Sequence, residues 1–192
     1  RSVRLQATTV TMSGALVRND ALVNLDDEGG FASLDGLYLA FGRSHVDNHT
    51  HITHNAPHCV SREHYKGVLG DRGHAVFHGR IVVQPGAQKT DSVQNNQNLL
   101  LSADAEIDTK PQLEIYADDV KCAHGATVGQ LDETAVFYLM SRGIDRQAAR
   151  RMLTQAFAAD VLNRIELPAL RSYLEAQAVQ RLSPEQVRES ES

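Results

Sequence analysis

A cysteine and a histidine two residues apart form the most chemically informative pair in this chain of 192 residues. Cys122 and His124 lie in Lys121-Cys-Ala-His-Gly-Ala-Thr127, a segment that we expect to be extended. Because residues i and i+2 of a strand point to the same face, the thiol and the imidazole would lie side by side, where they can bind iron, copper or zinc. The alternative is a buried Cys packed beneath a hydrogen-bonded His, since free Cys is among the most buried residue types.

Six of the nine histidines form a second cluster between His45 and His64, together with Cys59. His49 and His51 would share one face of a strand, as in half of a zinc or cupin site. This pattern suggests a metal-dependent β-helix or cupin-like enzyme, with the ligands among His49, His51, His54 and His58. No His-Glu-x-x-His or Cys-x-x-Cys pattern accompanies the cluster, so a polar ladder of hydrogen-bonded imidazoles is the alternative.

Short extended segments fill the first 131 residues and would position both groups. Turn residues separate these segments at Asp27-Glu-Gly-Gly30, Asp35-Gly36, Asp71-Arg-Gly73, Pro85-Gly86 and Asp108-Thr-Lys-Pro111. The expected strands are Val3–Met12, Ala15–Leu25, Phe31–Leu39, His45–His54, Val76–Val83, Asn98–Leu101, Leu113–Ala117 and Val120–Val128. Many short strands without helices predict a mainly β body, and the pattern alone fits a sandwich, a jelly roll or a parallel β-helix.

The pattern changes to a helical one at Asp132, a predicted N-cap. A second helix is expected near Asp145, and a third begins near Pro168. The second helix has an apolar i, i+4 series formed by Ala149, Leu153, Phe157, Val161 and Ile165. The sequence therefore predicts a β core over residues 1–131, a small helical subdomain over residues 132–183 and a polar, disordered tail over residues 184–192.

Composition excludes several classes of function. The net charge of −5 argues against nucleic-acid binding, and no apolar run approaches the ~20 residues that cross a membrane. Cys59 and Cys122 form no disulfide framework, and the chain begins without a signal pattern, so we expect a cytoplasmic protein. The phosphate loop, the Rossmann fingerprint and the nucleophile elbow are all missing from the sequence.

Three further polar segments carry weaker hypotheses. Asp118-Asp119 could mimic the acid/base pair of a polysaccharide-active β-helix, although solvated surface is the more economical interpretation. The segment Gln94-Asn-Asn-Gln-Asn98 is expected to form an amide ladder inside a coil. We expect Ser61, Arg62 and Glu63 to form a charged network that braces a turn.

Four long motifs closely resemble the C-terminal part of SufD-like proteins in the SufB/SufD family, the scaffold subunits of the SUF iron–sulfur cluster assembly machinery. They are His45-Val-Asp-Asn-His-Thr50, Pro57-His-Cys-Val-Ser-Arg-Glu63, Lys121-Cys-Ala-His-Gly-Ala-Thr127 and Gln130-Leu-Asp-Glu-Thr-Ala-Val-Phe-Tyr-Leu-Met-Ser-Arg-Gly143. The resemblance implies a right-handed parallel β-helix with a small α-helical subdomain, and further sequence ahead of residue 1. It also implies a non-catalytic scaffold.

The resemblance implies that His124 takes part in cluster assembly, with Cys122 as the weaker candidate. Iron–sulfur clusters usually need about four protein ligands, mostly Cys, so one chain with two cysteines would hold only a transient cluster shared with SufB and no tightly bound cofactor. SufB carries an assembly cysteine 28 positions ahead of its equivalent histidine. Asn96 stands at that distance from His124, and an amide cannot accept sulfane sulfur.

The resemblance also implies two protein partners. SufB would pair with the β-helix, whose unpaired strand edges also favour a homodimer when the chain is isolated. The ATPase SufC would dock on the C-terminal helices, with Arg146, Arg150 and Arg151 bordering the contact. Neither a nucleic acid nor a membrane is expected as a partner.

Overall fold

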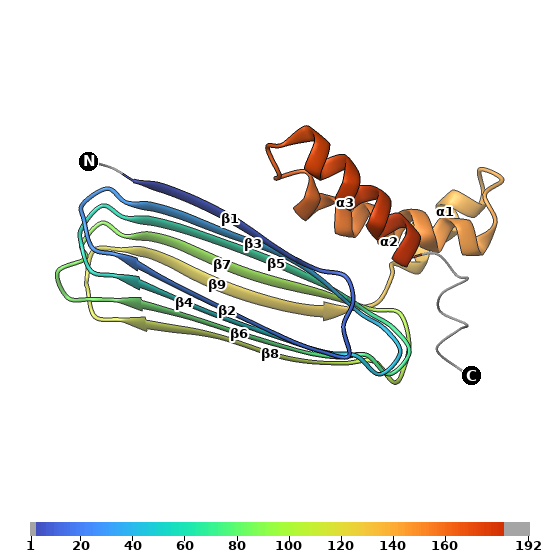
Figure 1. The fold of residues 1–192 in the computed structure, drawn as a ribbon, viewed down its shortest axis with the longest axis horizontal. Coiled ribbons are helices and arrows are strands. Elements are labelled where there is room, and N and C mark those ends of the chain that lie inside the picture. The colour runs from blue at the N-terminus through green and yellow to red at the C-terminus, as the bar shows by residue number, and fades with distance from the viewer. Residues whose placement is uncertain (1–2, 183–192) are drawn as a thin grey trace.

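A computed structural model describes residues 3–182 of the chain as a β-helix followed by helices (Figure 1). Within this range there are nine strands: β1 (Arg4–Thr11), β2 (Leu16–Leu25), β3 (Phe31–Ala40), β4 (His45–His54), β5 (Val60–Leu69), β6 (His74–Val83), β7 (Asp91–Leu100), β8 (Glu106–Ile115) and β9 (Lys121–Gly129). The odd strands form one sheet in the order β1-β3-β5-β7-β9, and the even strands form the other, β2-β4-β6-β8. The chain therefore alternates between two sheets and makes a solenoid of about four turns. This confirms the parallel β-helix.

Successive coils stack in parallel register over almost the whole length of each strand. Phe31 pairs with Val60, and His45 pairs with His74. The number of residues per coil varies. Arg4 pairs with Phe31, 27 residues later, whereas His74 pairs with Glu106, 32 residues later. This variation lies in the turns and explains why no sequence repeat is visible.

Three strands differ from the prediction. Strand β5 was missed, and β7 is much longer than the predicted Asn98–Leu101, because both strands point polar side chains inward and so lack the usual apolar alternation. The predicted turn at Asp108–Pro111 is wrong, because these residues lie within β8. Strand β8 is the last strand of its sheet in the described range, and an edge strand tolerates Pro111 because its missing N–H removes no ladder hydrogen bond.

The three predicted helices are present as α1 (Glu133–Met140), α2 (Arg146–Leu162) and α3 (Pro168–Arg181). Asp132 caps α1 by accepting a hydrogen bond from the Thr134 backbone N–H at 2.8 Å, and Asp145 caps α2 through the Ala148 N–H at 2.9 Å. Pro168 lies in the first turn of α3. Of the helices within residues 3–182, none is long and apolar enough to cross a membrane. The predicted tail at residues 184–192 lies outside the described part of the chain.

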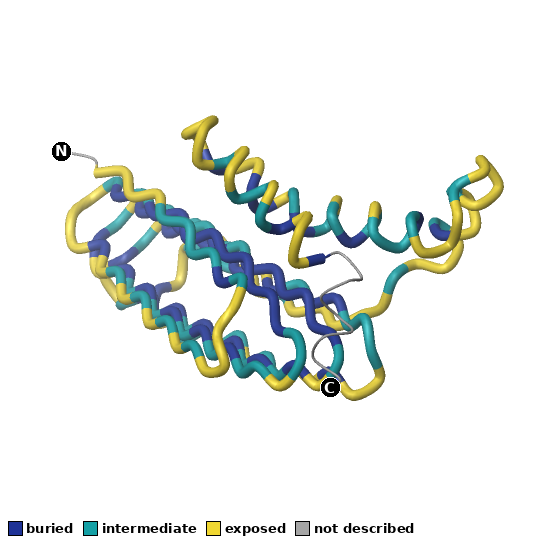
Figure 2. Tube along the Cα trace, turned by 45° about the vertical axis from the view of Figure 1, so that its right-hand side comes forward, coloured by how far each residue is buried: buried dark blue, intermediate teal, exposed yellow. Residues whose placement is uncertain are grey.

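Helices α2 and α3 pack on the outer face of the sheet that contains β3 and β5 (Figure 2). Their shared apolar cluster joins Leu37, Leu39 and Val68 of the strands to buried residues of the helices: Ala158, Val161, Leu162 and Ala178. Polar contacts flank this cluster.

The first polar contact is an ion pair in which Lys66 Nζ lies 2.8 Å from a carboxylate oxygen of Asp160 on α2. His64 bonds to the same carboxylate at 2.8 Å. Beyond α2, Arg164 donates to the buried carboxylate of Asp35 on β3 at 3.2 Å. Apolar and charged contacts therefore hold the sheet and the helices together along one interface, the seam between α2 and strands β3 and β5.

The interior of the β-helix contains an apolar core with fitted aromatic rings. Tyr65 of β5 lies in register with Gly36 of β3, and a Cβ atom at residue 36 would overlap the Tyr65 ring. Tyr38 is accommodated in the same way by Gly67 in the neighbouring coil. Each ring therefore fits inside the β-helix because the in-register residue of the adjacent coil is a glycine, which has no side chain.

Buried polar residues share this interior, which corrects one expectation and confirms part of another. Strand alternation sends Ser61 and Glu63 inward, whereas Arg62 points outward and bonds to Asp91, so these residues form no single network. The amides of β7 bond partly to one another within the coil, where Asn98 donates to Oδ1 of Asn96 at 2.7 Å, and do not form a continuous ladder between coils. Their partners include the carboxylate of Glu63 for Gln94. A stacked amide pair occurs elsewhere, where Asn19 donates to Asn48 at 2.9 Å.

Two of the interior groups have strongly shifted pKa values. Burial raises the pKa of Glu63 to about 7, although a hydrogen bond donated by Gln94 stabilises the charged form. Burial lowers the pKa of His54 to about 4, and its Nε2 lies 2.9 Å from the hydroxyl of Ser61. The β-helix therefore holds an acid that is half protonated near neutral pH and an imidazole that is neutral.

Replacement of Gly36 by Ala tests the fit of the Tyr65 ring. The added methyl group must displace a buried ring, so we expect the free energy of unfolding to fall by about 1–3 kcal/mol in urea denaturation. Gly86→Ala is the control, because nothing lies within 4 Å of a Cβ atom at that turn. It should leave stability unchanged or raise it by up to about 1 kcal/mol. Equal effects of the two substitutions would contradict the steric argument.

Replacement of Glu63 by Gln tests the buried acid. An unfolded Glu titrates near 4.5 and the folded one near 7, so the folded state binds the extra proton and loses stability as pH rises between these values. We expect Glu63→Gln to be more stable than the unmodified protein at pH 8 by about 3 kcal/mol, with a much smaller difference at pH 4.5.

The measurement for Glu63→Gln is urea unfolding at pH 4.5, 6 and 8. His54 contributes a pH dependence of opposite sign, because its pKa is lowered in the folded state, but it does so in both proteins. The difference between the two proteins therefore isolates Glu63. A difference that does not change with pH would show that this carboxyl keeps its ordinary pKa.

Candidate functional site

Cys122 and His124 lie on β9, where the β-helix ends in the described range. They pair in register with Ser92 and Gln94 of β7, both of which are completely buried and therefore point into the solenoid. Because in-register residues of parallel strands point to the same side, Cys122 and His124 also face the axis of the solenoid. No strand of the described range continues the sheet beyond β9, so this inward face of the last coil is open, and His124 is exposed.

The two side chains differ in their surroundings. Cys122 is half-buried against the main apolar core, and burial raises the pKa of its thiol, as does the nearby charge of Asp91. A thiol with a raised pKa is protonated at neutral pH and is a poor metal ligand. His124 makes no hydrogen bond or ion pair with any described residue. The imidazole is therefore the more available ligand, whereas Cys122 packs against the apolar core.

Asn96 lies on β7, next to the candidate site. It pairs with Ala126 and is completely buried. Its amide donates to the Tyr38 hydroxyl at 3.0 Å and to the Tyr65 backbone oxygen at 3.3 Å. The residue 28 positions ahead of His124 is thus an inward-pointing amide that is hydrogen-bonded within the β-helix. An amide cannot accept sulfur as a cysteine thiolate can.

Apolar side chains border the open end of the solenoid. Ile115 and Tyr116, at and just after the end of β8, are exposed, as is Val128 on β9. Strands β8 and β9 are the last strands of their two sheets in the described range, so each has one unpaired edge. This end combines exposed apolar groups, free backbone edges and the imidazole of His124.

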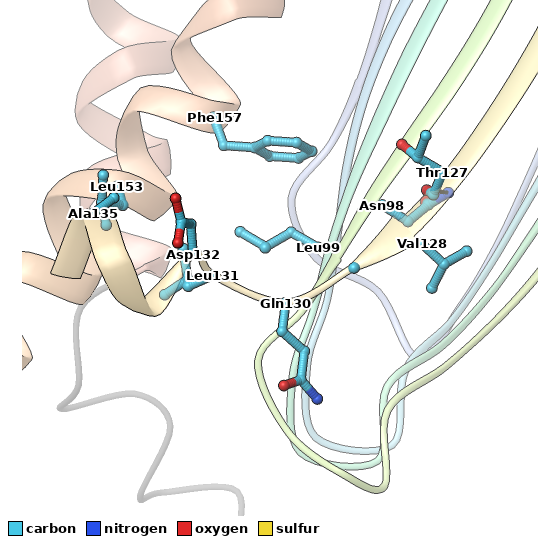
Figure 3. A pocket seen from close by; sticks show the side chains of 11 residues that line it. Asn98, Leu99, Thr127, Val128, Gln130, Leu131, Asp132, Ala135, Leu153 and Phe157 are labelled. Carbon is cyan, nitrogen blue, oxygen red and sulfur yellow. Dashed lines mark hydrogen bonds between the residues drawn. The ribbon is translucent and has the colours of Figure 1, made fainter. Parts of the chain in front are cut away.

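A pocket of about 310 Å³ lies between the end of β9 and the helices (Figure 3). Val128 and Leu131 line it from the strand side, and Leu153 and Phe157 line it from α2. The pocket is predominantly apolar, although the carboxylate of Asp132 lies beside it. It separates the helical hairpin from the last coil.

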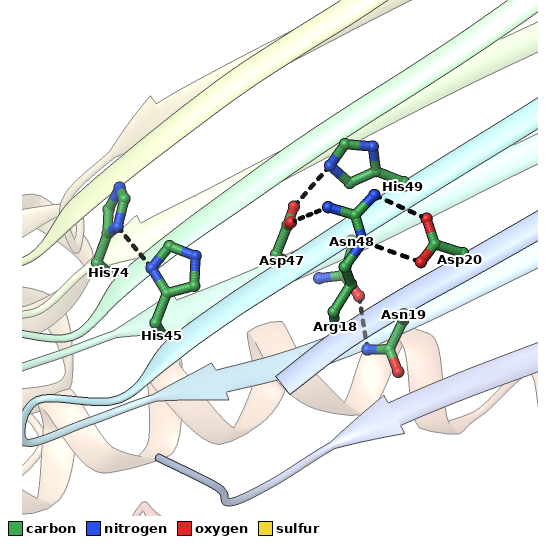
Figure 4. A network of polar contacts seen from close by, with 8 residues as sticks. All are labelled: Arg18, Asn19, Asp20, His45, Asp47, Asn48, His49 and His74. Carbon is green, nitrogen blue, oxygen red and sulfur yellow. Dashed lines mark hydrogen bonds and ion pairs between the residues drawn. The ribbon is translucent and has the colours of Figure 1, made fainter. Parts of the chain in front are cut away.

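The predicted histidine cluster is dispersed. His45 and His49 lie on the outer face of β4, and His51 lies on the same face. Figure 4 shows the contacts there: His45 Nδ1 lies 2.9 Å from Nδ1 of His74, and His49 lies 2.8 Å from Asp47. Asp47 is also bound by Arg18 at 2.8 Å. His74 and His78, which the sequence argument did not single out, join this face: the ring of His74 lies tilted beside His45, and the ring of His78 meets His49 edge-on.

The remaining histidines of the cluster lie elsewhere. His54 is inside the solenoid, His58 is in a turn 4.0 Å from Glu28, and His64 bonds to Asp160 of α2. Over residues 3–182, no group of three or more His, Cys, Asp or Glu side chains is arranged to hold a metal ion. The predicted metal-enzyme ligands are therefore not brought together. The dispersal of these histidines could have been recognised only from their positions within strands. Strand alternation and turns place residues that are close in sequence on different faces of the β-helix.

Two of the three arginines of α2 form ion pairs within the molecule. Arg146 donates to one carboxylate oxygen of Glu133 at 2.7 Å, and Arg150 donates to the other at 2.9 Å. Both contacts tie α2 to the first turn of α1. Phe137 and Tyr138 of α1 are 71% and 55% exposed, so the outer surface of this hairpin is more aromatic than the sequence argument anticipated.

Comparisons with known proteins identify the family of this chain. The SufBD core domain of the SUF system for FeS cluster assembly matches residues 1–157. The iron–sulfur cluster assembly protein SufD of Escherichia coli is 43% identical over 171 residues, which cover 89% of this chain and 40% of that protein. An iron–sulfur cluster assembly SufBD family protein of Synechocystis is 38% identical over 89% of this chain and 38% of its own length.

SufD of Bacillus subtilis is 30% identical over 79% of this chain and 35% of its own length. The chain thus spans about two fifths of the curated relatives that it matches. The family match covers the whole β-helix and the first helices, including the strand that carries Cys122 and His124. The chain belongs to the SufBD core-domain family of the SUF system.

Proposed function

We propose that this chain is the C-terminal part of a SufD-like scaffold subunit in cytoplasmic SUF iron–sulfur cluster assembly, and that it acts without catalysing a reaction of its own. The observation that carries the proposal is the position of His124. Its imidazole lies on the open inward face of the last coil, exposed and without a described partner. The family match and the similarity to two proteins named SufD supply the type of process.

The available ligands support a shared cluster as the cargo of the complex. His124 can give one nitrogen ligand, whereas the protonated thiol of Cys122 must first lose its proton. Cys59 is fully buried in a turn, and its thiol donates to the backbone oxygen of Asp27 at 3.3 Å. One free imidazole falls short of the roughly four ligands that a cluster requires. The other ligands therefore come from a partner, and the cluster is bound only transiently.

The open end of the β-helix is the surface that suits such a partner. A second β-helix can pair its own free strand edges with β8 and β9 and cover the apolar groups around His124. SufB is the proposed partner, because it would bring the cysteine for which this chain has Asn96. In the isolated chain the same end can pair with a second copy. The net charge of −5 gives no basis for a nucleic-acid partner.

The hairpin of α1 and α2 is the proposed docking site for the ATPase SufC. Phe137 and Tyr138 supply an exposed aromatic anchor, and aromatic residues are enriched among the residues that dominate binding energy. Arg146 and Arg150 position the hairpin through Glu133 and stay partly exposed at its border, where Arg151 also lies. The arginines thus shape the docking surface as well as border it.

Replacement of His124 by Ala tests the cluster site. Loss of a metal ligand should lower iron and sulfide per assembled complex by about tenfold or more, while the subunits remain associated. The measurement is metal and sulfide quantification of the complex purified with SufB and SufC. His51→Ala on the outer face of β4 is the matched control and should load normally. Normal loading of the His124→Ala complex would refute the assignment.

Replacement of Phe137 by Asp tests the docking surface. A charge in the centre of an aromatic anchor should weaken SufC binding by about tenfold or more, measured by calorimetry with the full-length subunit. The control is Tyr173→Asp on α3, where the side chain is 60% exposed but lies on a different helix. Tyr173→Asp should bind as the unmodified protein does. If the two substitutions weaken binding equally, the contact is not centred on the α1–α2 hairpin.

A further inference from the structure

Three residues of successive coils form a column inside the β-helix that ends at His124. Glu63 of β5 pairs in register with Gln94 of β7, and Gln94 pairs with His124 of β9. Glu63 and Gln94 are both buried, whereas His124 is exposed because its coil is the last. Neighbouring strands of a sheet lie about 4.8 Å apart, so each side chain of the column can contact the next.

The amide of Gln94 is fixed on one side only. Its Nε2 donates to Oε2 of Glu63 at 2.5 Å, and a Cβ atom at Gly79 on the facing sheet would overlap this nitrogen. The amide is therefore confined between β5 and the facing sheet. Its other atom, Oε1, is buried and has no hydrogen-bond partner among the described residues. A buried acceptor without a partner is costly, so a donor is needed at this point.

His124 is the donor that the register places beside this acceptor. An imidazole carries an N–H on at least one ring nitrogen, and His124 has no described partner of its own. The amide nitrogen faces β5 through Glu63, which leaves Oε1 for the side of the amide that faces β9. The open end leaves the exposed ring of His124 room to rotate about its side-chain bonds toward Gln94, its in-register neighbour.

We propose that Gln94, held by Glu63, is a positioning residue that accepts a hydrogen bond from one ring nitrogen of His124. The contact selects one tautomer and turns the lone pair of the other nitrogen outward from the open end, toward a metal ion. Metal-binding histidines generally donate their second N–H to an acceptor that orients the ring. The inference deepens the proposed function, since it assigns the residue that prepares His124 for a metal.

The test reads the tautomer of His124 directly in the metal-free full chain. Nitrogen chemical shifts from ¹⁵N-histidine-labelled protein, recorded at pH 8, separate the two neutral tautomers. In the unmodified protein one tautomer of His124 should exceed the other by about tenfold, the bias that one buried hydrogen bond can supply. Gln94→Leu should abolish this bias. The control Gln97→Leu lies on the same strand but points outward, and it should retain the bias.

A second variant keeps the test decisive if Gln94→Leu does not fold. The exchange Glu63→Gln with Gln94→Glu keeps the volume of the pair and reverses its hydrogen bond, so residue 94 still offers an acceptor to His124. This double variant should retain the tautomer bias. Equal tautomer populations in the unmodified protein, an unchanged bias in folded Gln94→Leu, or a lost bias in the folded double variant would each overturn the proposal. An unchanged bias in Gln94→Leu would show that a group other than Gln94 sets the tautomer.

Failure of this inference can be distinguished from failure of the proposed function. If Gln94→Leu abolishes the bias but His124→Ala complexes load iron and sulfide normally, Gln94 orients the ring and the cluster-assembly role of His124 is wrong. If His124→Ala prevents loading while the tautomers are equally populated, His124 is a ligand and Gln94 does not position it. The two measurements share no readout, so each conclusion stands independently.

Discussion

The in-register stacking of parallel coils is the constraint on which the rest of this structure depends. Every inward position lies directly against the same position in the coils before and after it, so a side chain fits only if its two neighbours leave it room, and its polar atoms look first to those neighbours for partners. Tyr65 is accepted because Gly36 lies against it, and Glu63 is accepted because Gln94 donates to it. The solenoid thus replaces a long-range packing problem by a series of contacts between adjacent coils.

The same constraint has a different effect at the last described coil. A position that elsewhere would be interior has a neighbour on one side only, and the side chain there is exposed while its backbone stays fixed in the sheet. Cys122 and His124 are in this situation. The end of the solenoid therefore presents inward-type residues on a rigid strand, with a buried polar column behind them. A loop could expose the same imidazole, but it would lack both the fixed backbone and the column.

The sequence predicted the number and order of the helices, where each begins and the general β character, because Asp132, Asp145 and Pro168 act locally. It predicted the strands least well where the inward residues are polar, as in β5 and β7. A strand is recognised in a sequence by apolar residues at every second position, and these two strands lack that pattern. Imidazole contacts between coils are present for His45 and His49, as the polar-ladder interpretation expected, whereas the metal site is not assembled in the described range for a related reason. Spacing along a strand specifies a face, but which strands lie beside that face depends on the register of distant coils, and this cannot be obtained from a single segment.

The helices depend on the β-helix through a seam that mixes charge with apolar contact. Hydrogen bonding to Lys66 and His64 lowers the pKa of Asp160, so this carboxylate stays ionised down to lower pH than an isolated Asp. Asp160 is half exposed, so solvent limits what the pair contributes to stability, and its main effect is to fix where α2 lies on β5. The apolar pocket beside β9 leaves the α1 end of the hairpin without comparable support. A force applied to α1 would therefore reach the His124 strand directly, through the short connection between Gly129 and Glu133, and would reach the central coils through α2.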